Sequence, residues 1–467
     1  MKIRIGTQLM MALLAASLMV SCGSSRHYER SDSVADRLYG EQEGDSTQNL
    51  ANLSWQELFN DSILVHLIDE GLEHNYDMQN AIAGVDQAES YFKQSRAAQW
   101  PTLSAGVSYR RIGLADTPTF PLDNFDTFSL GVSASWEVDI WGKMRTAKRA
   151  AYAQYLGTSA ARQAVQTKLI SSIASGYYTL LALDKQLKIA EESVRVYQEL
   201  SQSMETLKES GMVTGAAVVQ SEAAQYAAQI LIPELKQQIV VTESTVRILL
   251  GRTEGSIERS EIDQQKANDF IASGVPLQLL DRRPDVMQAE YAVMASYEMV
   301  GNAKSYFYPS LTLVANNAGF NRSIIEEWFN PASLTATVLG GLTAPIFNKR
   351  ANRTRLEVAK SQQEVAVNNF KSSLLNAGKE VTDALSQYDH VSQKIELRTH
   401  QLEALNKSVD YTRELLVYGS ATYTEVLDAQ QNLLNAQLND VNDQLQKLST
   451  VVSLYKALGG GWTSDAE

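Results

Sequence analysis

The chain has 467 residues, of which 20% are charged and only 9 are proline, so disorder is not expected overall. Its formal net charge of -13 argues against a nucleic-acid partner, which would require a basic face. None of its 5 histidines has a partner at metal-ligand spacing, and no phosphate loop or nucleophile motif is present. The sequence therefore predicts no enzyme, no metal site and no bound cofactor.

The first residues are typical of a secretory signal. Lys2 and Arg4 precede an apolar run from Leu9 to Val20, which is too short and too early for a spanning helix. We expect residues 1–21 to be a signal peptide that is removed.

Cys22 is the only cysteine in the chain and directly follows this run. It resembles the acylated cysteine of a bacterial lipobox, although Met19 stands where that pattern prefers leucine. The sequence predicts a covalent lipid on Cys22, made of a diacylglycerol and an N-acyl chain, and a lipid-anchored segment over residues 22–60. The alternative is a chance cysteine near a cleavage site.

The rest of the chain is an internal duplication. A shift of 208 residues keeps proline, glycine and strand starts together over a long span. The matches include Pro101 with Pro309, Gly211 with Gly419, Thr214 with Thr422, and Leu250-Gly251 with Leu458-Gly459. We expect one repeat over residues 61–252 and another over 277–462, with a linker at 253–276 and a tail at 463–467.

Each repeat begins with a predicted helix, over Asp61–Gln99 and Asp281–Phe307, and continues with two predicted strands. The strands alternate apolar residues with Ser, Thr and Gly, as in Phe128–Trp136. The predicted loops between them are Arg111–Asp126 and Asn321–Pro331. The stretch from Leu311 to Phe320 is the least regular.

Long helical stretches follow the strands, over Trp141–Ser210 and Phe347–Tyr418, with apolar residues recurring at three and four positions. About 70 residues at ~1.5 Å each give a rod of roughly 100 Å. Each rod ends at a glycine suited to a left-handed cap, and a return helix follows. At the second turn, Thr422–Glu425 has the pattern of a capping box, whereas the first turn lacks the acidic partner.

An alternating strand fits either a half-buried soluble sheet or a tilted membrane strand. The uncharged polar positions and the aromatic residues at the strand ends favour the membrane strand. The aromatic residues predicted at the helical side are Trp100, Trp141, Tyr308 and Phe347. Those predicted at the loop side are Tyr109, Phe128, Phe320, Trp328 and Phe329.

Four strands cannot close a membrane barrel, because an open edge leaves unpaired backbone groups in lipid. Two copies would give eight strands, whose interior is filled by side chains, and three would give twelve and leave a lumen. The predicted fold is therefore a mixed α+β membrane protein. In it, the four strands of each chain share a barrel with strands of further copies, and coiled-coil-like helices continue the barrel into the periplasm.

Several motifs together resemble the TolC-like outer membrane efflux proteins, specifically the lipoprotein exit ducts of RND-type pumps (NodT/OprM-like). They are "RAAQWPTLSAGVSY", "ASWEVDIWGK", "LLDRRPDVMQAE", "FYPSLTL", "YGSATYTEVLDAQ" and "LYKALGGGW", spread over nearly the whole mature chain. The resemblance implies a passive channel in the outer membrane that exports drugs or other small toxic compounds. It also implies a homotrimer with a 12-strand barrel and two partners, a periplasmic adaptor protein and an inner-membrane pump.

The resemblance further implies a periplasmic gate at Asp428, the aspartate of the "LDAQ" motif. Thr424 stands where the family often has a large apolar residue, and the repeat partner of Asp428 is Gln220. The alternative for Asp428 is a solvated carboxylate near a helix N-terminus. The helix turns are predicted adaptor contacts, or else ordinary turns; their residues are Gly211, Met212, Val213, Thr214, Gly419, Ser420, Ala421 and Thr422.

Arg282, Arg283 and Asp285 could be taken for a catalytic cluster, but we expect "RRPD" to open a helix, with Pro284 at an early position. A lipid-anchored coiled-coil scaffold would explain the rods and the lipid, but not the four alternating segments. Similar ducts also serve heavy-metal pumps and type I protein secretion, so the cargo stays open at this point.

Overall fold

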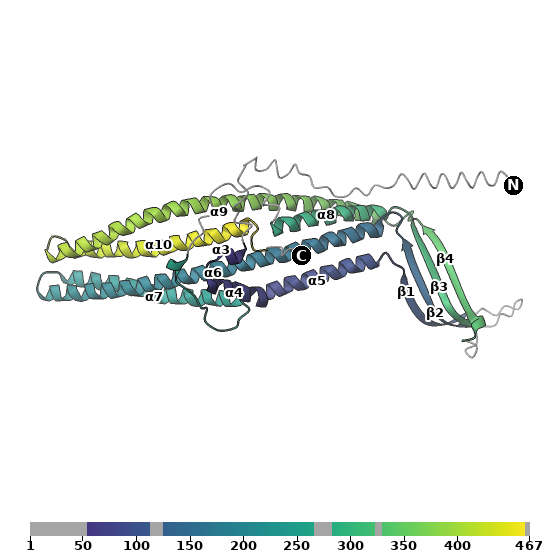
Figure 1. Ribbon diagram of the computed structural model, residues 1–467, viewed down its shortest axis with the longest axis horizontal. Helices are drawn as coiled ribbons and strands as arrows, with labels where there is room; N and C mark the ends of the chain where they lie inside the picture. The colour runs from purple at the N-terminus through teal and green to yellow at the C-terminus, as the bar shows by residue number, and fades with distance from the viewer. Residues whose placement is uncertain (1–53, 113–124, 266–282, 323–328, 463–467) are drawn as a thin grey trace. The chain divides into compact units, whose positions relative to one another are not determined.

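The computed structural model describes residues 54–112, 125–265, 283–322 and 329–462 (Figure 1). The predictions for the signal peptide, Cys22, Arg282, Trp328 and the C-terminal tail lie outside these residues. Backbone contacts divide the chain into two compact units. We call them the strand unit, which contains Val85–Thr158 and Ala289–Phe370, and the helical unit, which contains Asp32–Gly84, Ser159–Gln288 and Lys371–Glu467.

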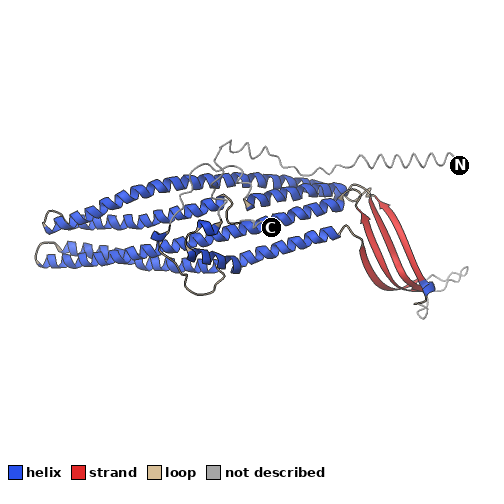
Figure 2. Ribbon diagram, viewed as in Figure 1, coloured by secondary structure: helices blue, strands red, loops and turns tan. Residues whose placement is uncertain are grey.

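The strand unit contains one antiparallel sheet with the strand order β1-β2-β3-β4 (Figures 1 and 2). The strands are β1 Thr102–Ile112, β2 Phe125–Val138, β3 Ser310–Arg322 and β4 Leu334–Thr343. The predicted mixture of helices and strands is confirmed, but the predicted loop boundaries are wrong by one or two residues. The strands continue to Ile112 and Arg322 and restart at Phe125, because the backbone ladder extends past the last alternating apolar residue.

The register gives the sheet two unlike faces. Tyr109 lies opposite Phe128 and Val107 opposite Leu130, while Ser108 lies opposite Ser129. Because side chains alternate along a strand, this register puts apolar residues on one face and serine, threonine and glycine on the other. In the single chain the apolar face lies open, with Val107 69% and Val338 75% exposed.

A bulge in β3 explains why its sequence is irregular. The register of β3 shifts by one residue against both of its neighbours, within the stretch Ala315–Gly319. Leu313 and Ala315 before the bulge and Phe320 after it therefore share the apolar face, although their spacing breaks strict alternation. Gly319 lies at this point against β2, where a Cβ atom would approach the carbonyl oxygen of Leu130 to 2.1 Å.

The helical elements carry the same offset as the sequence repeat. Helices α6 Lys143–Glu209 and α9 Ala351–Val417 both have 67 residues, and their bounds differ by 208 at each end. The return helices α7 Gly215–Leu249 and α10 Tyr423–Ala457 both have 35 residues and the same offset. Helices α5 Tyr76–Ala97 and α8 Pro284–Ser305 both have 22 residues, and their bounds also differ by 208. None of the helices in the described ranges is long and apolar enough to cross a membrane.

The core of the helical unit follows the predicted seam. Tyr197 of α6, Ala228 of α7 and Leu434 of α10 form one buried cluster. Val409 of α9 packs with Ala429 and Leu433 of α10 in another. Helix α10 therefore contacts α6 and α7 on one side and α9 on the other, which joins the two repeats through apolar packing.

Several predicted helix boundaries are wrong, including the end of the helix predicted to reach Phe307, which stops at Ser305. The long helices begin at Lys143 and Ala351 rather than at Trp141 and Phe347. In the first repeat, the Asp139 carboxylate accepts hydrogen bonds from the amides of Met144 (3.1 Å) and Arg145 (2.9 Å), which fixes the helix start two residues later. In the second, positive φ angles at Lys349 (54°) and Arg350 (68°) keep the backbone out of the helix until Ala351.

The predicted helix Asp61–Gln99 is two helices, α4 Ser62–His74 and α5, separated at Asn75. Asn75 is extended and only 5% exposed. Its amide oxygen accepts from the Met78 amide at 3.0 Å, and its amide nitrogen donates to the Leu249 carbonyl at 2.9 Å. Asparagine here caps α5 and ties it to α7, so tertiary contacts override the helical pattern.

Three short elements complete the described fold. Helix α3 Trp55–Leu58 and the 3-10 turn η2 Ile262–Gln264 belong to the helical unit, and the 3-10 turn η5 Pro331–Ser333 leads into β4 of the strand unit. The Asp61 carboxylate accepts from Tyr177 (2.6 Å), Ser260 (2.5 Å) and Gln265 (2.8 Å). Burial opposes ionisation of Asp61, but these hydrogen bonds favour the carboxylate, and the net result is a lowered pKa.

We expect Gly319→Ala to disrupt the β2–β3 pairing, because its Cβ would meet backbone atoms of β2 that cannot rotate away. Gly106→Ala on β1 is the matched control, since a Cβ atom at that position would meet no other atom within 4 Å. The measurement is the yield of folded, heat-modifiable protein in outer membrane fractions. Equal yields for the two variants would contradict the predicted role of Gly319.

Candidate functional site

The two helical turns at the tips of the helical unit have the same backbone geometry. Gly211 (φ 72°) and Gly419 (φ 67°) are left-handed, as predicted. The Met212 amide donates to the Leu207 carbonyl at 2.9 Å, and the Ser420 amide donates to the Leu415 carbonyl at 2.9 Å. These bonds, with those of the two glycine amides, form a Schellman cap at the end of each long helix.

The side chains of the turns are largely open to solvent in the single chain, and Met212 is 70% exposed. Val213 and Ala421 are half-buried, and the other predicted contact residues are exposed. The turns thus present small and apolar groups with little charge. Their contact with an adaptor stays a prediction.

The two repeats differ in how the first turn of the return helix is capped. Thr422 and Glu425 form the predicted capping box: the Thr422 side chain accepts from the Glu425 amide (3.4 Å), and the Glu425 carboxylate accepts from the Thr422 amide (2.7 Å). Thr214 precedes α7 without any side-chain cap bond. The second turn is therefore the better fastened of the two.

Asp428 and Thr424 lie in the first two turns of α10, and both side chains are exposed in the single chain. They are one helical turn apart on the same face, since residues four apart are neighbours on a helix. The placement puts a carboxylate close to the tip at an open surface. Its role as a gate stays a prediction.

One contact near Asp428 was not predicted from the sequence. The Tyr423 hydroxyl of α10 donates to the amide oxygen of Gln220 on α7 at 2.6 Å. Gln220 is the repeat partner of Asp428, so the position that carries an acid in one repeat accepts an inter-repeat hydrogen bond in the other. The pair is 203 residues apart in sequence, and no local pattern announces it.

Arg283 has the structural role expected of the "RRPD" motif. Its side chain is 4% exposed and donates to Asp285 (2.7 Å), to Glu380 of α9 (2.7 Å) and to the Ala457 carbonyl of α10 (2.9 Å). Burial alone would raise the pKa of Asp285, but the guanidinium of Arg283 holds it below its ordinary value. The cluster fastens three helices and leaves no nucleophile.

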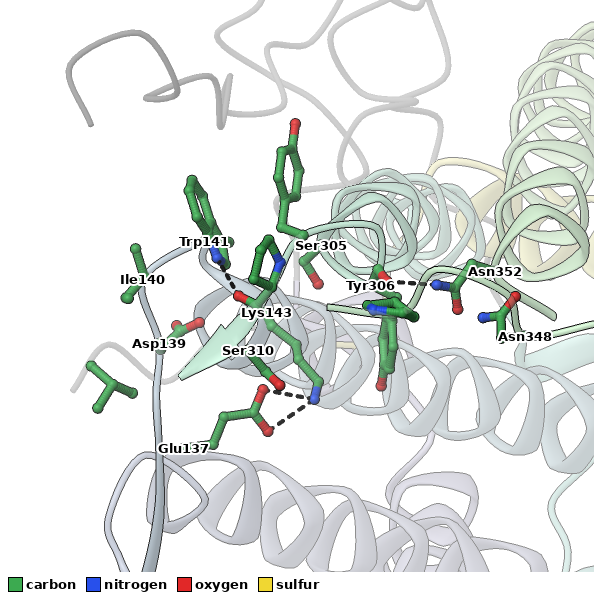
Figure 3. A pocket seen from close by; sticks show the side chains of 14 residues that line it. Glu137, Asp139, Ile140, Trp141, Lys143, Ser305, Tyr306, Ser310, Asn348 and Asn352 are labelled. Atoms are coloured by element: carbon green, nitrogen blue, oxygen red, sulfur yellow. Dashed lines mark hydrogen bonds and ion pairs between the residues drawn. The ribbon is translucent and has the colours of Figure 1, made fainter. Parts of the chain in front are cut away.

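A pocket of about 220 Å³ lies in the strand unit, where the strands meet the helices (Figure 3). Lys143 is 3.0 Å from both oxygens of Glu137, and the Trp141 indole donates to the Pro309 carbonyl at 2.7 Å. Asn352 donates to the Tyr306 carbonyl at 2.6 Å. These bonds link β2, the start of α6, the end of α8 and the start of α9, so we interpret the pocket as a structural joint.

The predicted membrane-interface aromatic residues gather at two ends of the sheet. At the helical end, the Trp141 and Tyr308 rings stack with centroids 4.9 Å apart, and Trp100 (73%) and Phe347 (85%) are exposed. At the loop end, the ring centroids of Tyr109 and Phe128 are 5.0 Å apart, and those of Phe320 and Phe329 are 5.7 Å apart. Aromatic residues at both ends of an apolar sheet face are the placement expected of membrane strands, and the role of these residues at the membrane interface stays a prediction.

Within the described ranges, no cluster of three or more His, Cys, Asp or Glu side chains could hold a metal ion. The features that remain are the two-faced sheet, the long helices and the exposed tips. This combination of a sheet with one apolar face and very long helices is typical of a membrane channel subunit.

Comparison with known proteins agrees with this class. The family model described as "Outer membrane efflux protein" matches residues 67–252 and 275–460, so the chain belongs to this family. The cation efflux system protein CusC of Escherichia coli is 28% identical over 418 residues, covering 89% of this chain and 90% of CusC. The probable outer membrane lipoprotein SilC of Salmonella typhimurium is 28% identical over 415 residues, covering 87% and 88%.

A solved structure of CusC superimposes with a TM-score of 0.84 at 27% identity, covering 94% of this chain and 100% of that one. The predicted family and the predicted location in the outer membrane are both confirmed.

We expect Thr422→Ala to destabilise the first turn of α10 by about 1 kcal/mol, which corresponds to roughly fivefold faster amide exchange. Thr214→Ala should change the start of α7 much less, since Thr214 makes no cap bond. Hydrogen exchange of residues 423–426 and 215–218 measures both effects. Equal acceleration at the two turns would show that the capping box adds nothing.

Proposed function

We propose that the protein is the outer membrane exit duct of a tripartite RND-type efflux pump. The two-faced sheet carries this proposal. Its apolar face is open in the single chain, and the opposite face is lined by serine, threonine and glycine, which suits lipid outside and water inside. The channel is passive, and the pump in the inner membrane supplies the energy.

The proposed assembly is a homotrimer with a barrel of twelve strands. The sheet has unpaired edges at β1 and β4, and such edges cannot face lipid. Two copies would give a barrel whose interior is filled by side chains, whereas three leave an aqueous lumen. The proposed repeats, residues 61–252 and 277–462, then alternate around the tube.

The proposed contacts outside the trimer are made by the helix turns and by Cys22. The exposed tips, Gly211–Thr214 and Gly419–Thr422, contact a periplasmic adaptor that bridges to the inner-membrane pump. The lipid on Cys22 gives the mature chain a second attachment to the outer membrane, as in the relative named a lipoprotein.

The proposed cargo is a range of small toxic compounds, including drugs. Relatives of this chain are named for different cargos: CusC for cations, and SrpC of Pseudomonas putida for solvents, each 28% identical to it. The test is expression in cells that lack their own exit duct but retain adaptor and pump. Restored resistance to solvents and dyes supports the proposal; restored resistance to copper and silver alone assigns the duct to heavy-metal efflux instead.

The proposed gate is the ring of three Asp428 carboxylates that a trimer would form. Carboxylates held close together repel one another, and together they attract divalent cations. Their exposure in the single chain leaves them free to face a common axis. Thr424, one turn nearer the tip, adds no charge and no large apolar group to this ring.

Cys22→Ala should reduce delivery to the outer membrane more than it reduces folding, because the proposed barrel holds the membrane without the lipid. Fractionation and the protease resistance of the fraction that folds measure the two effects. Mass spectrometry of the parent should find two or three acyl chains on Cys22. An unmodified N-terminal peptide that begins upstream of Cys22 would end the lipid proposal.

Asp428→Ala should make the channel conduct more often in planar bilayers and weaken block by divalent cations, because it removes the carboxylates and leaves room. Asp428→Asn separates charge from size, and should lose the block with a smaller gain in conductance. Asp389→Ala is the control, since Asp389 is an exposed acid in the middle of α9. If Asp428→Ala conducts and is blocked like the parent, the gate lies elsewhere, in the Gly419–Thr424 tip.

A further inference from the structure

The internal duplication carries information about a contact that the single chain does not contain. The pairing of β3 with β4 repeats that of β1 with β2: Thr102 lies opposite Ser135, and Ser310 opposite Thr343. Both residues of the first pair move by 208 to give the second. Between the helices and the bulge in β3, the sheet is thus a tandem of two equivalent hairpins, joined by the β2–β3 pairing.

A second copy of this chain would bring its β1 to the free edge of β4, and this seam is the repeat equivalent of β2–β3. In the half of β2–β3 next to the helices, Val138 lies opposite Leu311 and Ala134 opposite Ala315. Moving the β2 residue forward and the β3 residue back by 208 converts these pairs into Ile346 with Leu103 and Leu342 with Val107.

We infer that β4 of one copy pairs with β1 of the next in this register, with Leu342 opposite Val107 and Ile346 opposite Leu103. The inference rests on the proposed trimeric duct and names the residues of its seam. The register keeps apolar residues on one face across the seam without further adjustment.

The unequal lengths of β2 and β4 support this register. Strand β2 ends at Val138, but its pairing with β1 stops at Ser135, so its last three residues are held by β3 alone. The equivalent residues after β4 are Ala344, Pro345 and Ile346, and β4 ends just before them at Thr343. Residues 344–346 have no partner in β3, so only the next copy could pair with them, and Pro345 could accept but not donate a hydrogen bond in that pairing.

The exposure of these residues agrees. Ile346 is 100% exposed and Leu342 68%, and their proposed partners Leu103 and Val107 are 72% and 69% exposed. Val138, the repeat equivalent of Ile346, is half-buried because β3 covers it. Side chains this large and this exposed on both free edges are complementary to each other.

Cysteine cross-linking tests the register, and the chain is suited to it because Cys22 is its only cysteine. The test variant carries Leu342→Cys and Val107→Cys. Two controls carry Leu342→Cys with Ala105→Cys or with Tyr109→Cys, one step to either side on the same face. Within one chain β1 and β4 are separated by two strands, roughly 14 Å, so a disulfide can only join different copies.

We expect the Leu342→Cys/Val107→Cys variant to run as covalent dimers and trimers on denaturing gels after mild oxidation. Directly opposed strand residues lie within disulfide reach, so it should form at least about fivefold more cross-linked chain than either control. Stronger cross-linking in a control would overturn the register.

The same variants, reduced, are assayed for conductance and resistance. If the variants are active but a control cross-links more than the test variant, the register is rejected and the proposed function is retained. Absence of cross-links together with absence of conductance counts against both.

Discussion

The unpaired backbone of a sheet edge is the constraint on which this structure depends. Each N–H or C=O left without a partner in hydrocarbon costs several kcal/mol, so a four-stranded membrane sheet cannot remain single. In the proposed assembly, the residues that follow β4, including the fully exposed Ile346, would meet the next copy. The internal duplication suits this arrangement, because the β2–β3 pairing within a copy would serve as the pattern for the pairing between copies.

The repeats share one backbone plan, and their differences lie in side chains. At the seam of the helical unit, the first repeat buries Ala190 and Leu235, where the second has Arg398 and Asp443, with a 3.0 Å ion pair between them. Asp443 is 1% exposed and also pairs with Lys394 at 2.5 Å, so removing Arg398 would leave this buried carboxylate with one of its two cationic partners. Such a pair disfavours a shift of α9 along α10, because the shift would separate the two charges. Apolar packing alone would oppose the same shift less.

Periodicity was enough to predict the sheet, the long helices and the glycine turns, because each of these follows from local chemistry repeated along the chain. It could not place the break at Asn75, whose cause is a hydrogen bond to Leu249 on a distant helix. For β3 it showed only an irregular pattern, because a bulge is defined by the pairing of a strand with its neighbours, which the sequence of β3 alone does not contain. The contact of Tyr423 with Gln220 was missed for the same reason: it depends on two hairpins meeting.

The two repeats also bear on how an exit duct can close. Around the proposed tube, six similar hairpins would meet at the tips, yet only the second repeat has an acid at the Asp428 position. Six carboxylates on one narrow axis would repel far more strongly than three, so alternation with Gln220 limits the electrostatic cost of closure. Gln220 instead accepts a hydrogen bond from Tyr423, five residues before that acid, and so links the two repeats close to the proposed gate. In the proposed trimer, divergence at this position would therefore alternate helix pairs that contribute a carboxylate with helix pairs that contribute a neutral amide.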